Sequence, residues 1–148
     1  MRFNLKVYHF FILIISLFLF SGSEYGNYSE LKIKNPYAIS PLEGMNTFAA
    51  YMSLTNISNE NISIIEISCS NTKKAFLHDM KMGSKNGMIS MEKIDSLIIG
   101  PRETIHLKPR GKHVMIVGLS SNITLNDEIS CLLGTKRGKN FPVSFKVR

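Results

Sequence analysis

Methionine and histidine are the residues of this sequence whose types and spacing indicate a specific chemistry. Four of the seven methionines that follow Met1 lie between Met80 and Met91, and a fifth, Met115, stands two residues after His113. Methionine often fills gaps in a core, but its thioether is also a soft metal ligand. Because histidines accompany the cluster, we interpret it as a metal site.

Two of these methionines follow a histidine at the same spacing. In a β-strand, side chains two residues apart point to the same face. His113 and Met115 therefore project together from one strand, as His78 and Met80 do from another. His106 alternates with apolar neighbours and should face away from the core, so it is not expected to be a ligand.

A hairpin would bring a further methionine to the same face. If residues 83–86 form a four-residue loop, Met82 pairs with Gly87 and His78 lies opposite Met91. Directly opposed residues have Cβ atoms about 5 Å apart, so one metal ion can contact both side chains. The predicted metal ligands are His78, Met91, His113 and Met115.

Two imidazoles and two thioethers favour monovalent copper. Thioethers bind Cu(I) well and have little affinity for Zn(II), Mg(II) or Ca(II), whereas imidazole binds copper in either oxidation state. All four ligands are neutral, and thioethers form no disulfides, so the site should persist in an oxidising compartment. The sequence therefore predicts one bound Cu(I). Met80 and Met82 remain alternative sources of a thioether in place of a named one.

The chain after its N-terminal segment alternates apolar and polar residues with the period of β-strands. Turn residues separate the alternating runs, and no amphipathic helix is visible. About nine short strands are expected, at residues 31–35, 48–54, 62–67, 74–82, 88–94, 104–108, 113–119, 128–133 and 141–147. This pattern predicts an all-β fold, a single antiparallel Greek-key β-sandwich or barrel.

The first residues have the pattern of a secretory signal peptide. Arg2 and Lys6 precede an apolar run at residues 10–20, and small residues follow it. We expect a signal peptide at residues 1–23 and a mature domain at residues 24–148. The protein would then be periplasmic, or tethered to the membrane if the signal is not cleaved. The apolar run is shorter than the about 20 residues that a stable membrane span requires.

The charge of the chain does not indicate nucleic-acid binding. There are 18 basic and 11 acidic side chains, which give a formal charge of +7. The basic residues are scattered, and their densest run, residues 136–139, has no interleaved aromatic residues to stack on bases. No nucleic acid is therefore expected as a partner, and we interpret the basic excess as a solvated surface.

Catalytic chemistry is not expected. The sequence has no G-x-S-x-G elbow, no H-E-x-x-H motif and no glycine-rich phosphate loop, so we predict that the protein is not an enzyme. No histidine or methionine follows Met115, which excludes a blue-copper loop headed by Cys131. Cys69 and Cys131 are not in C-x-x-C spacing, and the sequence leaves open whether they form a disulfide.

The spacing of the predicted ligands resembles that of the PCu(A)C family of periplasmic Cu(I)-binding chaperones. The family motif is H-x10-M-x21-H-x-M, and this chain reads H-x12-M-x21-H-x-M. Residues 47–56 resemble the family strand gAAYmtitN, and residues 107–115 resemble its LkPGGyHvM segment. The resemblance extends over residues 31–147 and implies a cupredoxin-like β-barrel.

Three differences from the family pattern stand out. The first gap of the motif is two residues longer, Arg110 replaces the first glycine of the Pro-Gly-Gly turn, and Tyr37 stands where tryptophan is common. Two extra residues in a hairpin turn preserve the facing of both strands, whereas one would reverse it. We therefore expect the longer gap to leave the site intact.

The resemblance implies a biological role and partners. It implies delivery of Cu(I) to the dinuclear copper site of cytochrome c oxidase, alongside a Sco-type protein, or to another periplasmic copper acceptor. The protein is expected to be a monomer. Two other functions stay open: a copper-sequestering resistance protein that uses the same site as a sink, and a metal-free secreted interaction domain.

Overall fold

The computed structural model describes residues 29–40, 46–82, 89–119 and 123–148, which form ten β-strands and no helix. The strands are β1 (Leu31–Ile39), β2 (Thr47–Asn56), β3 (Ile62–Cys69), β4 (Thr72–Met82), β5 (Ile89–Ile94), β6 (Leu97–Ile99), β7 (Thr104–Leu107), β8 (His113–Leu119), β9 (Glu128–Thr135) and β10 (Asn140–Val147). The predicted all-β class is confirmed. Alternation missed β6 because three residues are too short a run to show a period.

The strands form one mixed sheet. Its order is β5-β4-β8-β2-β1-β10-β9-β3-β6, with β7 paired to β2 beside this path. The neighbours are antiparallel except β1 and β10, which run parallel. The expected antiparallel arrangement therefore changes at this one pair. Strands that are joined by a tight turn must run antiparallel. No such turn joins β1 to β10, because they come from opposite ends of the described chain, so these two strands can pair in parallel.

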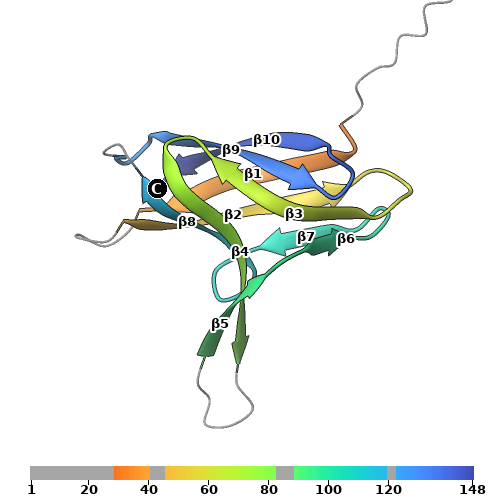
Figure 1. Cartoon of the computed structure of the whole chain (residues 1–148), viewed down its shortest axis with the longest axis horizontal. Coiled ribbons are helices and arrows are strands. Elements are labelled where there is room, and N and C mark those ends of the chain that lie inside the picture. Colours follow the sequence, from red (N-terminus) through yellow and green to blue (C-terminus); the bar gives the residue numbers. More distant parts are fainter. Residues whose placement is uncertain (1–28, 41–45, 83–88, 120–122) are drawn as a thin grey trace, which may run out of the picture.

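The sheet curves on itself (Figure 1). The apolar core inside it takes buried side chains from every strand except β5, and the half-buried Ile94 of β5 packs against that core. Alternation explains which residues are inside. On β10, Phe141, Val143 and Phe145 are buried, whereas Pro142 and Lys146 between and after them are exposed. Because β5 adds only Ile94 to this core, the end of the sheet that carries it is held mainly by its pairing with β4.

Two ties hold strands together across the fold. Cys69 on β3 and Cys131 on β9 are register partners joined in a disulfide, with Cα atoms 4.0 Å apart. The pairing that the sequence left open is therefore present. The fully buried Asn56 side chain ends β2 and donates hydrogen bonds to the carbonyls of Ile99 (3.0 Å) and Gly100 (2.9 Å). Its amide nitrogen also donates to the Glu60 carbonyl at 2.7 Å, so this side chain ties the end of β2 both to the following turn and to the end of β6.

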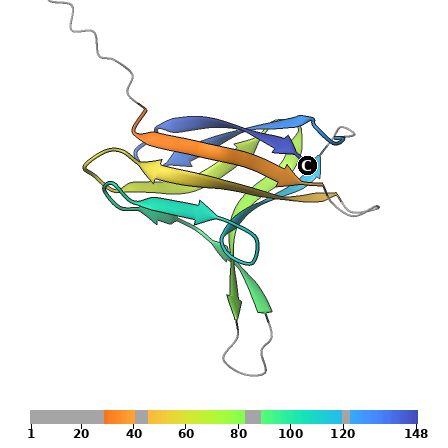
Figure 2. The ribbon, with the colours of Figure 1, turned by 180° about the vertical axis from the view of Figure 1, so that it is seen from behind.

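The β4–β5 hairpin projects from the body of the fold, as both views show (Figure 1, Figure 2). Its register pairs Met80 with Met91 and His78 with Lys93. The predicted register, with Met91 opposite His78, is wrong by two residues because the connection takes residues 83–88 and not four residues. A shift of two preserves the strand parity, so Met91 still faces the same side as His78.

Some expectations fall on residues outside the described ranges. These include the signal peptide at residues 1–23, the first residues of the expected mature domain, and the connection at 83–88. Among the residues that the structure describes, no helix is long and apolar enough to cross a membrane. The described fold begins at Ser29, shortly before β1.

Candidate metal centre

Two predicted ligands, His78 on β4 and His113 on β8, face each other directly. Their Cα atoms are register partners in the antiparallel β4–β8 pair. Their ring centroids lie 5.9 Å apart, and the ring planes meet at 72°. Directly opposed side chains are close enough to contact the same metal ion. The pairing of β4 with β8 therefore brings two imidazoles together.

A backbone contact orients the His113 ring. His113 is only 5% exposed, and its Nδ1 lies 2.9 Å from the carbonyl oxygen of Gly111. Since a carbonyl only accepts hydrogen bonds, Nδ1 carries the proton and donates it. In the neutral ring the lone pair is then on Nε2, the arrangement found in metal-binding histidines whose other nitrogen is held by a backbone carbonyl.

His78 is kept neutral and available. Burial lowers the pKa of its imidazole, and the charges of His113 and Lys93 lower it further. Its Nδ1 is shielded from solvent and has no hydrogen-bond partner among the described residues. A buried polar atom without a partner is costly. A metal ion that this ring coordinates would use the lone pair of the neutral form.

The predicted thioethers lie on either side of the histidine pair. Met115 is two residues after His113 on β8 and is half-buried. Met91 is on β5, where it faces Met80 and lies diagonal to His78. Diagonal neighbours are about 7–8 Å apart, which long side chains can bridge. Met91 is 53% exposed, so one side of the centre is open to solvent or to another protein.

Aromatic rings surround the histidines, and the sequence interpretation missed them. Tyr51 lies 6.3 Å from His113 between ring centroids, and Tyr37 lies 5.2 Å from Tyr51. Phe76 stacks on His78 at 6.0 Å and 19°. Alternation along β2 and β4 was the available signal for Tyr51 and Phe76. Tyr37 reaches the same face as the register partner of Tyr51.

An ion pair lies beside the histidines on the opposite face of the strands. Asp79 and Lys112 directly follow and precede the two histidines, and their charged groups are 2.8 Å apart. Asp79 therefore points away from the imidazoles, as its strand parity predicts. The pair joins β4 to the segment before β8 and supports the register that aligns the rings.

Other metal-binding groups do not gather in the described part of the chain. Within it, no group of three or more His, Cys, Asp or Glu side chains is placed to hold a metal ion. Both cysteines are in the disulfide. His106 on β7 is exposed, and its Nδ1 is bound to the Ser53 hydroxyl at 2.8 Å. Among the described residues, the side chains of a metal-binding type that lie near His78 and His113 are therefore the methionines.

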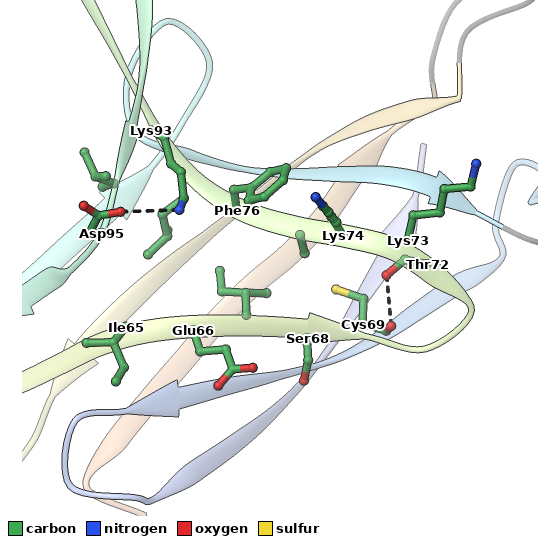
Figure 3. Close-up of a pocket in the computed structure, with 14 residues that line it drawn as sticks. Ile65, Glu66, Ser68, Cys69, Thr72, Lys73, Lys74, Phe76, Lys93 and Asp95 are labelled. Atoms are coloured by element: carbon green, nitrogen blue, oxygen red, sulfur yellow. Dashed lines mark hydrogen bonds and ion pairs between the residues drawn. The ribbon is translucent and has the colours of Figure 1, made fainter.

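A groove of about 390 Å³ lies between β3 and β4, next to the histidines (Figure 3). Its described lining includes neither histidine nor methionine. Phe76 and Lys93 separate it from the centre, and the Lys93 ammonium lies 3.4 Å from Asp95 and 5.8 Å from the Phe76 ring centroid. The groove therefore adjoins the candidate site without contributing ligands to it.

The donor set fits a soft monovalent ion. Neutral imidazoles and thioethers supply no negative charge to a hard dication, whereas thioether sulfur suits Cu(I). The Gly111 carbonyl fixes one ring, and the neutral second ring has a buried nitrogen without a partner. The two imidazoles and the partly exposed Met91 therefore lie together at the edge of the fold.

The fold is that of known copper-binding domains. The copper-bound PCuAC domain from PmoF2 matches with a TM-score of 0.66 and 18% identity, over 80% of this chain and 92% of that one. The solution structure of Cu(I)-bound DR1885 from Deinococcus radiodurans matches with a TM-score of 0.63 and 23% identity, over 85% of each chain. At these identities the likeness concerns the fold, and it confirms the expected cupredoxin-like architecture.

A curated relative and a family model extend the comparison to sequence. The putative lipoprotein Lxx21020 from Leifsonia xyli subsp. xyli is 27% identical over 106 residues, which is 71% of this chain and 63% of that protein. This chain thus spans less than two thirds of that relative. The model of the putative lipoprotein LpqE-like family matches residues 31–147, nearly all of the described fold. The chain therefore belongs to the LpqE-like family of putative lipoproteins.

Proposed function

We propose that the protein binds one Cu(I) through His78, Met91, His113 and Met115 and passes it to another protein. The observation that carries the proposal is the direct opposition of His78 and His113 on β4 and β8, with thioethers on the same face. Neutral imidazole and thioether ligands together favour Cu(I) over divalent ions. The fold shared with copper-bound PCuAC domains supports the same choice of ion.

Delivery is favoured over storage by the exposure of the site. Met91 is 53% exposed on a projecting hairpin, whereas His113 is buried. An acceptor can therefore approach the outer thioether first and displace the ligands one at a time. A storage site would gain from enclosing its ion. A metal-free interaction domain would have no use for this arrangement of neutral metal-binding groups.

An exported location is part of the proposal. The Cys69–Cys131 disulfide supports this location, because disulfides form and persist in oxidising compartments such as the periplasm. The family description names putative lipoproteins, which are exported proteins. The acceptor we propose is the dinuclear copper site of cytochrome c oxidase, with or without a Sco-type protein. The excess of basic residues would steer the protein towards an acidic acceptor surface, an effect that salt weakens.

Copper binding is tested on the domain from residue 24 onwards with its disulfide intact. Titration with Cu(I) under argon, against a chromogenic Cu(I) chelator, should give one bound ion. X-ray absorption of the loaded protein should then show two nitrogen and two sulfur neighbours. A shell without sulfur, or a preference for Zn(II) in competition, would refute the proposed site.

Delivery needs a separate test. The Cu(I)-loaded domain is mixed with the apo soluble domain of the oxidase subunit, and the two are separated and assayed for copper. Movement of copper to the acceptor, faster at low salt than at high salt, supports a chaperone. Retention of copper, when the acceptor has the higher affinity for it, would leave sequestration as the function.

A further inference from the structure

The β4–β8 register creates a symmetry that the motif spacing does not reveal. His78 and His113 are directly opposed, and each is followed two residues later by a methionine, Met80 on β4 and Met115 on β8. In an antiparallel pair, residues two positions after an opposed pair lie on opposite sides of it. Met80 and Met115 therefore flank the two imidazoles at equal displacement along the strands, about 6.7 Å in each direction.

Met91 is placed less favourably than Met80. It lies on the third strand, so two strand spacings of about 4.8 Å each separate it from His113. Met80 is on the same strand as His78 and only one spacing from His113. Met80 and Met91 are themselves register partners, which places their thioethers side by side on one face of the hairpin.

The surroundings of this methionine pair leave its face open to an ion. On the opposite face of the hairpin, Lys81 and Glu92 form an ion pair at 2.6 Å. Lys93, which is the register partner of His78, extends its ammonium towards Asp95 at 3.4 Å (Figure 3). Met80 is half-buried beside the histidines, while Met91 is 53% exposed further out.

We infer that Met80 is a Cu(I) ligand that shares the hairpin-side coordination position with Met91. This inference rests on the proposed function and refines its ligand set. Copper at the histidine pair is held by Met115 on one side and by either Met80 or Met91 on the other. The half-buried Met80 retains the ion, and the exposed Met91 brings it to the solvent-exposed edge of the site.

The exchange provides a route for stepwise transfer. A ligand of the acceptor can take the place of Met91 while Met80 and the histidines still hold the ion. The copper ion is then never released into water, and the number of ligands around it stays constant at each step. In this scheme Met91 affects the rate of copper transfer more than the affinity for Cu(I). When Met91 is replaced or displaced, Met80 takes its coordination position.

Methionine-to-leucine variants of the oxidised domain test the inference with Cu(I) alone. X-ray absorption should count two sulfur neighbours in wild type, in Met80→Leu and in Met91→Leu, but one in the double variant. The dissociation constant should rise less than tenfold in each single variant and more than a hundredfold in the double variant. Met52→Leu, in the core and away from the centre, is the matched control and should leave both measurements unchanged.

A measurement on the unmodified protein avoids any effect of the substitutions on folding. With ¹³C-labelled methionine methyl groups, the Met80 and Met91 resonances should both shift when one equivalent of Cu(I) is added. A Met80 resonance that stays fixed, together with one sulfur neighbour in Met91→Leu, would overturn the inference while leaving the proposed function in place. Wild-type protein that binds no Cu(I) would instead refute the proposed function itself.

Discussion

His78 and His113 occupy directly opposed positions on β4 and β8, with ring centroids 5.9 Å apart. One ring is oriented by the Gly111 carbonyl, and the other is held neutral by burial and by neighbouring positive charge. Because the two residues are register partners on antiparallel strands, backbone pairing sets the separation of the two imidazole rings. The thioethers are long and unbranched, and they supply the adaptable part of the centre.

Removing either imidazole should abolish tight binding of copper. We expect His78→Asn and His113→Asn to raise the Cu(I) dissociation constant at least a hundredfold, in line with about 1.4 kcal/mol for each factor of ten. Competition against a chromogenic chelator measures this change. His106→Asn is the control, because His106 is exposed on β7 and bound to Ser53. Equal losses in all three variants would contradict the assigned centre.

The lowered pKa of His78 predicts how the stability of the apo protein depends on pH. The folded state binds the proton of this ring less readily than the unfolded state, whose pKa is the ordinary 6.5. Stability should therefore fall as the pH drops below about 6.5 and level off below the folded pKa. Melting temperatures between pH 8 and pH 5 should show this loss in wild type and a smaller one in His78→Gln.

The charge of Lys93 offers a second check on the same group. Lys93 contributes to lowering the pKa of His78 after burial and His113. Lys93→Gln should therefore move the pKa of His78 upwards, which NMR titration of the imidazole can follow. The matched variant Lys146→Gln, on β10 away from the centre, should not move it. An unchanged pKa in both variants would mean that burial and His113 lower the pKa of His78 without a contribution from Lys93.

The disulfide should stabilise the fold without taking part in copper binding. It closes a loop between residues 62 positions apart, which is worth up to about 4 kcal/mol in the chain-entropy model. Chemical denaturation of the Cys69→Ser/Cys131→Ser variant should show a loss of this order. Its Cu(I) shell should keep two nitrogen and two sulfur neighbours. A loss of sulfur neighbours would place a cysteine in the centre and contradict the thioether assignment.

A control variant distinguishes the effect of the disulfide bond from the effect of changing residues on the strands that carry it. Ser68→Ala/Ser130→Ala changes two exposed neighbours of the cysteines on the same two strands, β3 and β9. Its free energy of unfolding should stay within about 0.5 kcal/mol of wild type, as surface substitutions usually do. A loss as large as in the cysteine variant would attribute the effect to the strand pair and not to the bond.

The all-β class was predictable because strand alternation is a local property of the sequence. On β10, buried and more exposed residues alternate, so the burial of a residue can be inferred from the residues one and two positions away. The parallel pairing of β1 with β10 was not predictable in this way. It joins segments from opposite ends of the described chain, and no turn between them records it. Short β6 likewise left no periodic signal.

The facing of the site residues follows from parity, but their register does not. Parity places His78, Met91, His113 and Met115 on one face for any shift of two residues. The length of the hairpin connection decides whether Met91 meets His78 or Met80, and alternation leaves that length open. The ion pair of Asp79 with Lys112 and the carbonyl contact of His113 also depend on the folded backbone.

The turn before β8 contains a residue in an unfavourable conformation, and its replacement gives the last prediction. Arg110 has φ of 62°, in the left-handed region that favours glycine. Pro109 precedes it, and the Gly111 N–H donates to the Lys108 carbonyl at 3.1 Å. Proline followed by a residue with positive φ is the pattern of a type II turn, which normally carries glycine at this position.

Arg110→Gly should therefore stabilise the domain. Relief of the left-handed strain is worth about 1–2 kcal/mol, and the added freedom of the unfolded chain offsets about 0.4–1 kcal/mol of it. A net gain of about 0.5 kcal/mol corresponds to a rise of about 2 °C in melting temperature for a domain of this size. Calorimetry can measure this rise, and copper affinity should change less than twofold because the arginine contributes no ligand.

Lys108→Gly is the matched control for this turn. Lys108 is exposed in the same turn but is not among the residues with positive φ. Glycine there gains no relief of strain and only increases the freedom of the unfolded chain, so the melting temperature should fall. Opposite signs for the two variants would establish the turn conformation that places the Gly111 carbonyl against His113. A fall in both would contradict it, since Arg110 would then not be strained in the folded protein.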